Sequence, residues 1–503
     1  AEMMAGIRVV IAENIERIYN ENCQNLGVLT STDFSLIDRI RNGDEIQLSE
    51  FTDGLDPITR QIIEYGGLFE FNVARMQGRV ETPSIESMSD SGVHAVPRDG
   101  DAAVDAEDSR RQRGAGDGND DPTPNAWLPE DGMAQAAVTS QPANHPVDDG
   151  HGLAPVGPRA GHRSMTVAEK IFARRWVKDA AKGEMGVPWV RPGDSGFVRT
   201  DWRFSHEYVS PMAAIFFEEK LGPDAKVNDP STIIMFRDHL TYLHEVMPKE
   251  RVQLGLLDVA RQLKDKQEEF AKKQGVIYYG ERLGIRLGSE AICHSKMLEE
   301  YAEPGQVIVG TDSHTPHSGA IGCIAFGIGT TAIFNSWITK DVRVSVPPSF
   351  KVVIRGRKPA NVTAKDFMLE ILRHPYIKDG HAIGQIIEYA GEAVEALSID
   401  ERATMTNMAA EVGAFTGIVA PDAKAVEYLV TERGVDRARA EQLCERLRSD
   451  DDAEYVKVIE IDASSVKPMV ALPGDPGNGL YIDELGADPV KLDVAYAGSC
   501  TAG

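Results

Sequence analysis

The sequence predicts a multi-domain α/β protein. From residue 164 onward, short apolar segments alternate with amphipathic segments of helical period, which is the pattern of parallel sheets covered by helices. The length of 503 residues is enough for roughly three or four domains. Residues 81–163 break this pattern and separate a small N-terminal unit from the rest of the chain.

The composition excludes several classes of protein. A formal net charge of −25 argues against general nucleic-acid binding, which needs a basic surface. Five scattered cysteines argue against a disulfide framework and favour a reducing, cytoplasmic location. No apolar run approaches 18 residues, so no membrane span is expected.

Residues 1–80 are predicted to form one compact unit of strands and helices. Its apolar stretches are short and are separated by helix-capping and turn residues. The expected elements are a buried strand at 7–12, a helix that Asn14 caps and that ends near Gly27, a hairpin-type turn at 42–45 leading into a strand at 46–48, and a helix at 58–65 that Gly66 and Gly67 end.

Residues 81–163 are dominated by Asp, Gly, Pro, Ser and Ala and have almost no apolar periodicity. Such a segment cannot bury enough surface to offset the entropy lost on ordering. We therefore expect a flexible acidic linker, with an acidic recognition segment as the alternative.

The remainder is expected to divide into α/β domains at 164–357 and 358–485, with 486–503 as the start of a further domain. The predicted elements are helices at 167–176 and 363–372 and strands at 196–198, 232–236, 306–309, 342–346, 351–354 and 492–496.

The most informative motif follows the apolar strand at 307–309. It places Thr311, Asp312, Ser313 and His314 on one tight turn before a glycine-rich stretch, 318–329, which we expect to form a closely packing helix. An acid, a hydroxyl and an imidazole at the end of a strand are suited to proton transfer. The structural alternative is a capped helix N-terminus, with Thr311 or Asp312 as the cap.

Other polar residues occur in comparable settings. Asp238 and His239 follow an apolar strand, His294 follows Cys293, and Asn407 and Glu411 are expected on one helical face because they are four residues apart. Cys500 lies in the terminal motif Ala-Gly-Ser-Cys-Thr. Each residue taken alone is more often structural, as a satisfied histidine, a solvated glutamate or an inert thiol.

The ordered set of motifs resembles the large subunit of the aconitase and 3-isopropylmalate dehydratase family over about residues 164–503. The motifs are Arg-Asp-His-Leu at 237–240, Gly-Thr-Asp-Ser-His-Thr-Pro at 310–316, Asn-Met-x-x-Glu-x-Gly-Ala at 407–414 and Gly-Ser-Cys-Thr at 498–501. Residues 1–80 resemble the later part of the family's swivelling small domain. The resemblance implies an aconitase-like fold of three-layer α/β/α domains plus a small swivelling β/α domain.

The resemblance also implies a [4Fe-4S] hydro-lyase or isomerase that dehydrates and rehydrates a hydroxy di- or tricarboxylic acid. Isopropylmalate-type and aconitase- or homoaconitase-type substrates fit equally. By motif match, Cys500 would bind the cluster, Asn407 would lie close to it, and Ser313 would bind substrate. Asp238 and His239 would protonate the departing hydroxide, while His294 and His314, oriented by Asp312 and Glu411, would complete the polar ring.

The chain departs from the family pattern in two ways. Two of the three cysteine ligands expected for a cluster are absent, because no C-x-x-C occurs anywhere, and the family's serine base would come before residue 1. We therefore expect either a fragment that lacks a C-terminal segment or a chain that needs a complementing subunit, unable by itself to assemble a three-cysteine cluster.

Two other interpretations remain open. The first is a non-catalytic or partner-dependent relative that kept the scaffold. The second is a mononuclear metal hydrolase that uses Asp238, His239, His294 and Asp312, although the sequence lacks the H-E-x-x-H and H-x-x-E-H signatures of many such enzymes.

Overall fold

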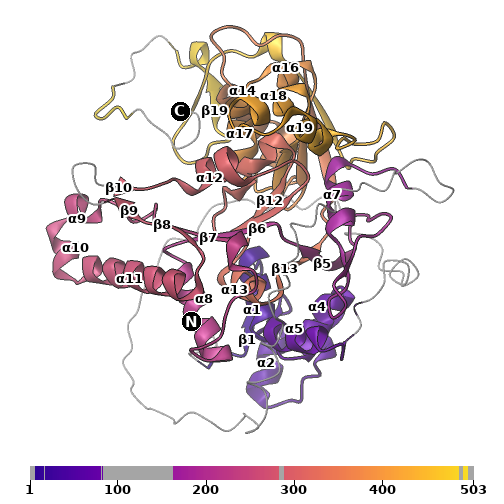
Figure 1. The fold of residues 1–503 in the computed structure, drawn as a ribbon, viewed down its shortest axis with the longest axis vertical. Coiled ribbons are helices and arrows are strands. Elements are labelled where there is room, and N and C mark those ends of the chain that lie inside the picture. Colours follow the sequence, from indigo (N-terminus) through magenta and orange to yellow (C-terminus); the bar gives the residue numbers. More distant parts are fainter. Residues whose placement is uncertain are drawn as a thin grey trace.

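The computed structural model describes residues 6–15, 17–80, 82, 163–282, 288–486 and 491–496. Two parallel sheets dominate these residues, and the N-terminal unit packs beside the first of them (Figure 1). The prediction of a multi-domain α/β protein is confirmed. The expected linker at 81–163 lies outside the described residues, except for residues 82 and 163.

The first sheet has five strands in the order β12-β11-β6-β7-β8, and every neighbouring pair is parallel. The strands are β6 (Trp202–His206), β7 (Ile233–Phe236), β8 (Ile277–Tyr279), β11 (Val307–Gly310) and β12 (Ile324–Gly327). Strands β7 and β11 contain only apolar residues and glycine and are buried along their whole length, which reflects coverage of both faces of the sheet.

Helices cover this first sheet and close its core. They are α7 (Val167–Arg175), α8 (Ser210–Leu221), α11 (Leu256–Gln274) and α13 (Thr330–Thr339). Helix α7 begins at a capping box in which Thr166 and Glu169 satisfy each other's backbone N–H groups. Aromatic side chains fill the space between helices, and the rings of Phe270 and Trp337 stack 5.3 Å apart.

The second sheet has four parallel strands in the order β16-β15-β14-β17. They are β14 (Ser349–Arg355), β15 (Ile386–Ala390), β16 (Thr416–Val419) and β17 (Val458–Asp462). The accompanying helices are α14 (Ala364–Leu372), α16 (Glu392–Ala396), α17 (Ile399–Asn407), α18 (Ala423–Thr431) and α19 (Arg437–Cys444). Strand β14 belongs to this sheet although it precedes the expected boundary at 357/358, and the division into domains stays a prediction.

The described residues of the N-terminal unit form a two-stranded parallel ribbon and five helices. Its elements are β1 (Val9–Ile11), α1 (Arg17–Asn25), β2 (Leu29–Ser31), α2 (Ser35–Asn42), α3 (Ser49–Thr52), α4 (Pro57–Glu64) and α5 (Leu68–Met76). Arg75 joins it to the large body through a buried ion pair of 2.6 Å with Asp341. Asp341 begins β13 (Asp341–Ser345), which pairs antiparallel with β5 (Ser195–Arg199).

Short elements complete the fold. They are β3 (Val177–Asp179), β4 (Glu184–Met185), α9 (Leu243–Val246), α10 (Lys249–Gln253), β9 (Glu281–Arg282), β10 (Gly288–Ser289), α12 (Cys293–Lys296), α15 (Pro375–Lys378), β18 (Met469–Ala471), β19 (Gly479–Tyr481), one π turn, η2 (Met297–Tyr301), and the 3₁₀ turns η1 (Pro230–Thr232), η3 (Thr315–Ile321), η4 (Ala463–Ser465) and η5 (Ile482–Glu484). Among the described helices, none is both long and apolar enough to cross a membrane.

Three predicted elements are wrong. The turn at 42–45 leads into no strand at 46–48, because Gly43 adopts a left-handed conformation that ends α2 as a C-cap. The glycine-rich stretch after His314 is not one helix but η3 followed by β12, and Cys323 lies between the two. Residues 491–496 contain no strand.

Candidate active site

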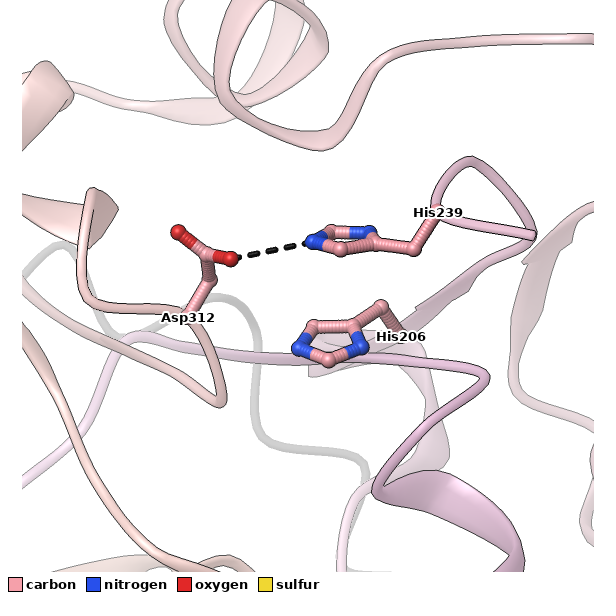
Figure 2. A group of neighbouring side chains, drawn as sticks. All are labelled: His206, His239 and Asp312. Carbon is pink, nitrogen blue, oxygen red and sulfur yellow. Dashed lines mark hydrogen bonds and ion pairs between the residues drawn. The ribbon is translucent and has the colours of Figure 1, made fainter. Parts of the chain in front are cut away.

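The carboxyl ends of three neighbouring strands of the first sheet carry the candidate site. Because β6 pairs in parallel with both β7 and β11, these ends lie side by side. His206 ends β6, Asp238 and His239 follow β7, and Asp312 follows β11. Figure 2 shows His206, His239 and Asp312 gathered at this edge. Crevices outside the carboxyl ends of parallel strands are the usual place for ligands in α/β folds.

Asp312 is the anionic centre of the group. Its Oδ1 accepts hydrogen bonds from His294 Nε2 at 2.9 Å and from the backbone N–H of His314 at 2.8 Å. Its Oδ2 lies 3.0 Å from His239 Nε2. Burial alone would raise the pKa of Asp312, but the hydrogen bonds from the three imidazoles outweigh burial and hold that pKa far below its usual range.

His239 is held between two carboxylates. Its Nδ1 lies 2.8 Å from Asp238 Oδ1, and the other oxygen of Asp238 accepts the backbone N–H of Cys293 at 2.7 Å. Burial opposes a charge on this ring, but the hydrogen bonds to Asp238 and Asp312 dominate and raise the pKa of His239 to about 10. The ring is therefore doubly protonated at neutral pH.

His206, which the sequence analysis did not single out, lies against the face of His239. The two rings stack with their centres 3.9 Å apart and an interplanar angle of 18°. His206 Nε2 lies 3.0 Å from the carbonyl oxygen of Thr311, and Nδ1 accepts the backbone N–H of Tyr208 at 3.3 Å. Burial and the nearby positive His239 lower the pKa of His206, which favours the neutral ring. The available signal was its position at the end of a strand.

The second sheet contributes Glu411, which lies at the amino end of strand β16. Glu411 Oε1 lies 3.2 Å from His314 Nε2, and hydrogen bonds to Asp312 and Glu411 raise the pKa of His314. The expected shared helical face of Asn407 and Glu411 is wrong, because α17 ends at Asn407 and Glu411 lies in the turn that leads to β16. Asn407 is buried, and its side-chain amide lies 3.3 Å from His317 Nδ1.

Close packing fixes the two sheets against each other near this contact. A Cβ added to Gly319 in η3 would lie 2.0 Å from the carbonyl oxygen of Gly417 in β16. Thr416 also donates a hydrogen bond of 2.6 Å to the carbonyl oxygen of Ala325 in β12. Only glycine permits such a backbone approach, which explains the glycine-rich composition of the motif.

The structure brings Asp238, His239, His294, Asp312, His314 and Glu411 into one connected network. Ser313 lies at its exposed side, with its hydroxyl 3.3 Å from His314 Nδ1. Neither Thr311 nor Asp312 caps a following α-helix, because η3 begins after His314. The interpretation as a capped helix is therefore wrong.

The described cysteines do not fit a cluster-binding role. Cys293 and Cys323 are buried, and burial raises the pKa of both thiols, which opposes the thiolate form that iron requires. Burial raises the pKa of Cys444 to about 12, and Cys23 lies in α1. The expected ligand Cys500 lies outside the described residues.

A single metal ion also fits the network poorly. One donor atom from each of His206, His239 and Asp312 lies within 4.8 Å of the others. However, both ring nitrogens of His206 have hydrogen-bond partners, and each oxygen of Asp312 already faces an N–H group. This arrangement favours proton transfer over metal chelation.

Known proteins with similar sequences cover most of the described large body. A family model described as "Aconitase family (aconitate hydratase)" matches residues 170–502. The 3-isopropylmalate dehydratase large subunit 1 of Pyrococcus furiosus is 35% identical over 340 residues, which cover 67% of this chain and 72% of that protein. The corresponding large subunit of a Sulfurihydrogenibium species is 33% identical, with coverage of 67% and 70%.

A plant relative and a solved structure extend the comparison. The chloroplastic 3-isopropylmalate dehydratase large subunit of Arabidopsis thaliana is 31% identical, with coverage of 67% of this chain and 62% of that protein. The crystal structure of aconitase X from Thermococcus kodakaraensis, in its holo-form, is 9% identical and covers 53% of this chain and 58% of that chain. Its TM-score is 0.29, which is too low to bear on the fold.

Proposed function

Because this chain belongs to the aconitase family, we propose that it acts as a hydro-lyase that reversibly removes water from a hydroxy di- or tricarboxylic acid. The single observation that carries this proposal is the His239 ring held between the carboxylates of Asp238 and Asp312. A hydroxide is a poor leaving group unless it receives a proton, and a doubly protonated imidazole supplies one.

The carboxylates of Asp238 and Asp312 have different roles at the His239 ring. Asp238 is 3% exposed and fixes the Nδ1 side, so the ring keeps one orientation. The Nε2 proton faces Asp312 at the partly exposed side of the ring, and it is the proton that a departing hydroxide can take. In the reverse direction the same nitrogen accepts a proton from the incoming water, as microscopic reversibility requires.

The other residues complete the polar surface around that proton. His294 and His314 share Asp312 with His239, so one carboxylate orients all three imidazoles. His294 Nδ1 is buried and has no hydrogen-bond partner among the residues that the structure describes. We assign Ser313, whose hydroxyl is exposed, to substrate binding, with isopropylmalate-type and citrate-type acids as the candidate substrates.

A [4Fe-4S] cluster and a partner subunit belong to the same proposal. Since the described cysteines do not fit the cluster, its binding would depend on Cys500 and on thiolates from outside this sequence, with Asn407 close to it. The relatives are named as large subunits, so we propose that a small subunit complements the site and supplies the base that takes the proton of the neighbouring carbon when water is lost. The alternative, a relative without catalytic activity, would keep the network but turn over no hydroxy acid.

The test replaces His239 with alanine in the complete protein. Turnover of isopropylmalate, citrate and homocitrate, followed by the ultraviolet absorbance of the unsaturated acid, should fall about 10²–10⁴-fold, as for loss of a general acid. The matched control is His244→Ala, which removes an exposed histidine from α9. Unchanged turnover in His239→Ala would remove His239 from the mechanism.

A further inference from the structure

Glu207 is a fully buried carboxylate that the proton-transfer scheme leaves unused. It follows His206 at the carboxyl end of β6, and its side chain is 0% exposed. Its Oε2 accepts the backbone N–H of Asp238 at 3.2 Å. Its Oε1 accepts the backbone N–H groups of His239, at 2.7 Å, and of Leu240.

A guanidinium completes this set of donors. Arg237 Nη1 lies 2.8 Å from Glu207 Oε1, and Arg237 Nη2 donates to the carbonyl oxygen of Leu240 at 3.0 Å. One carboxylate therefore receives three consecutive backbone N–H groups and one charged donor. A buried charge is costly unless it is paired and hydrogen-bonded in this way. The same contacts tie both ends of the turn 237–240 to the end of β6.

We propose that Glu207 is a positioning residue that fixes the Asp238–His239 turn at the distance from Asp312 that proton transfer requires. The proposal rests on the proposed function, because it assigns Glu207 a role through His239. Only His239 itself lies between the two acids: its ring Nε2 is 3.0 Å from Asp312 Oδ2, and its backbone N–H donates to Glu207. His206, the neighbour of Glu207, supports the opposite face of the same ring.

The role needs a carboxylate and not merely a polar side chain. In Glu207→Gln one oxygen becomes an NH₂ group, which faces at least one backbone N–H with a second donor. The turn must then shift or leave that N–H unpaired, at a cost typical of a lost buried hydrogen bond. A displacement of about 1 Å at a reacting group can lower a rate about 10²-fold, so a small shift is enough.

A second buried carboxylate provides the matched control. Glu388 in β15 of the second sheet is 4% exposed and accepts hydrogen bonds from Ser449 Oγ at 2.6 Å and Tyr455 Oη at 2.8 Å. Glu388→Gln removes the same charge from a comparable depth, but away from the histidine network. The comparison therefore separates the loss of a buried charge from the loss of positioning.

The experiment measures turnover and amide hydrogen exchange in the full protein and its two variants. We expect Glu207→Gln to lower kcat about 10–10²-fold with little change in KM, and to speed exchange of the amides of 238–240 at least about 10-fold while the β11 amides stay protected. Glu388→Gln should change neither kcat nor the exchange rates of the amides of 238–240. Normal kcat in folded Glu207→Gln, or slow exchange at 238–240, would overturn the proposal.

The variant Glu207→Asp and a spectroscopic measurement cover the cases in which Glu207→Gln does not fold or the wild type has no activity. If Glu207→Gln does not fold, Glu207→Asp keeps the charge but shortens the reach, and we expect the same changes in kcat and exchange to a smaller degree. Unaltered kcat and exchange there would overturn the proposal. If the wild-type protein turns over no hydroxy acid, the proposed function fails by itself. The position of Glu207 is then judged by exchange and by the ¹³C signal of the His239 ring, which should move in Glu207→Gln and not in Glu388→Gln.

Discussion

Both large sheets are parallel, but their carboxyl edges differ in chemistry. In the first sheet, β6 ends at His206, β7 is followed by Asp238 and His239, and β11 is followed by Asp312. At the corresponding ends of the second sheet, polar residues and glycine only begin the next helix or turn: Gly391 follows β15, Asp422 is the N-cap of α18 after β16, and Asp462 ends β17 and is the N-cap of η4. Both sheets present a carboxyl edge, but only the side chains at the edge of the first sheet form a candidate site.

The second sheet contributes Glu411 to the histidine network from the amino ends of its strands. Glu411 lies in the turn before β16, at the amino end of the strand, and reaches His314 across the junction of the sheets. The network therefore joins the carboxyl edge of one sheet to the amino edge of the other. Substitutions at the two ends should differ in the size of their effect on turnover: those in the first sheet should lower it most, while Glu411 of the second sheet acts only through His314.

The largest effect is expected from Asp312→Asn. The neutral amide cannot balance the charge of the His239 and His314 imidazolium rings and places an NH₂ donor where a carboxylate oxygen accepted, so the contact with His239 weakens. We expect kcat/KM to fall at least about 10³-fold, beyond the loss of a single general acid. The measurement is steady-state turnover with thermal unfolding of the same preparation.

The matched control for that substitution comes from the second sheet. Asp422→Asn weakens a 2.7 Å ion pair with the buried Arg402 and should lower the stability while leaving the turnover of the folded protein unchanged. Equal losses of turnover in the two variants would erase the proposed difference between the sheets.

Glu411→Gln should have the next largest effect. The neutral amide no longer stabilises the imidazolium of His314, so the pKa of His314 falls towards its ordinary value, while the surrounding turn keeps its backbone. We expect kcat to fall about 10–10²-fold with a small change in unfolding free energy. A large loss of stability with normal specific activity would instead make Glu411 a structural residue.

Site residues that follow an apolar strand could be predicted from the sequence, whereas residues that reach the site from a turn could not. Asp238, His239, Asp312 and His314 were predicted because an apolar strand before a polar turn is a local signal. Glu207 was missed because its role is to accept backbone N–H groups some thirty residues away, which no local pattern encodes. Glu411 was assigned to a helix because a spacing of four suits a helical face, but α17 ends first.

Gly319→Ala should act on the junction itself and have a smaller effect on turnover. The new methyl group would lie 2.0 Å from the carbonyl oxygen of Gly417, so η3 and β16 must separate. Overpacking of this kind costs about 1–3 kcal/mol of unfolding free energy, and we expect roughly a tenfold loss of kcat as His314 and Glu411 move apart.

A glycine outside the junction is the comparison for that variant. At Gly280 an added Cβ would lie 3.0 Å from the ring of Tyr278, a side chain that can move. Gly280→Ala should therefore be nearly neutral. Wild-type stability in Gly319→Ala would show that the two sheets are not held at this point.

The smallest expected effect is on the pH dependence of stability. The pKa of His239 rises from 6.5 to about 10 on folding, so its contribution to stability is complete below about pH 6.5 and is lost as the pH rises towards 10. After allowance for partial exposure, we expect the wild type to lose about 1–2 kcal/mol more unfolding free energy than His239→Asn between pH 7 and pH 9. Urea denaturation at both values measures this difference, with His244→Asn as the exposed control. Parallel pH profiles for the wild type and His239→Asn would mean that His239 is not charged at the carboxyl edge of the first sheet, and the proposed contrast with the second sheet would then lose its chemical basis.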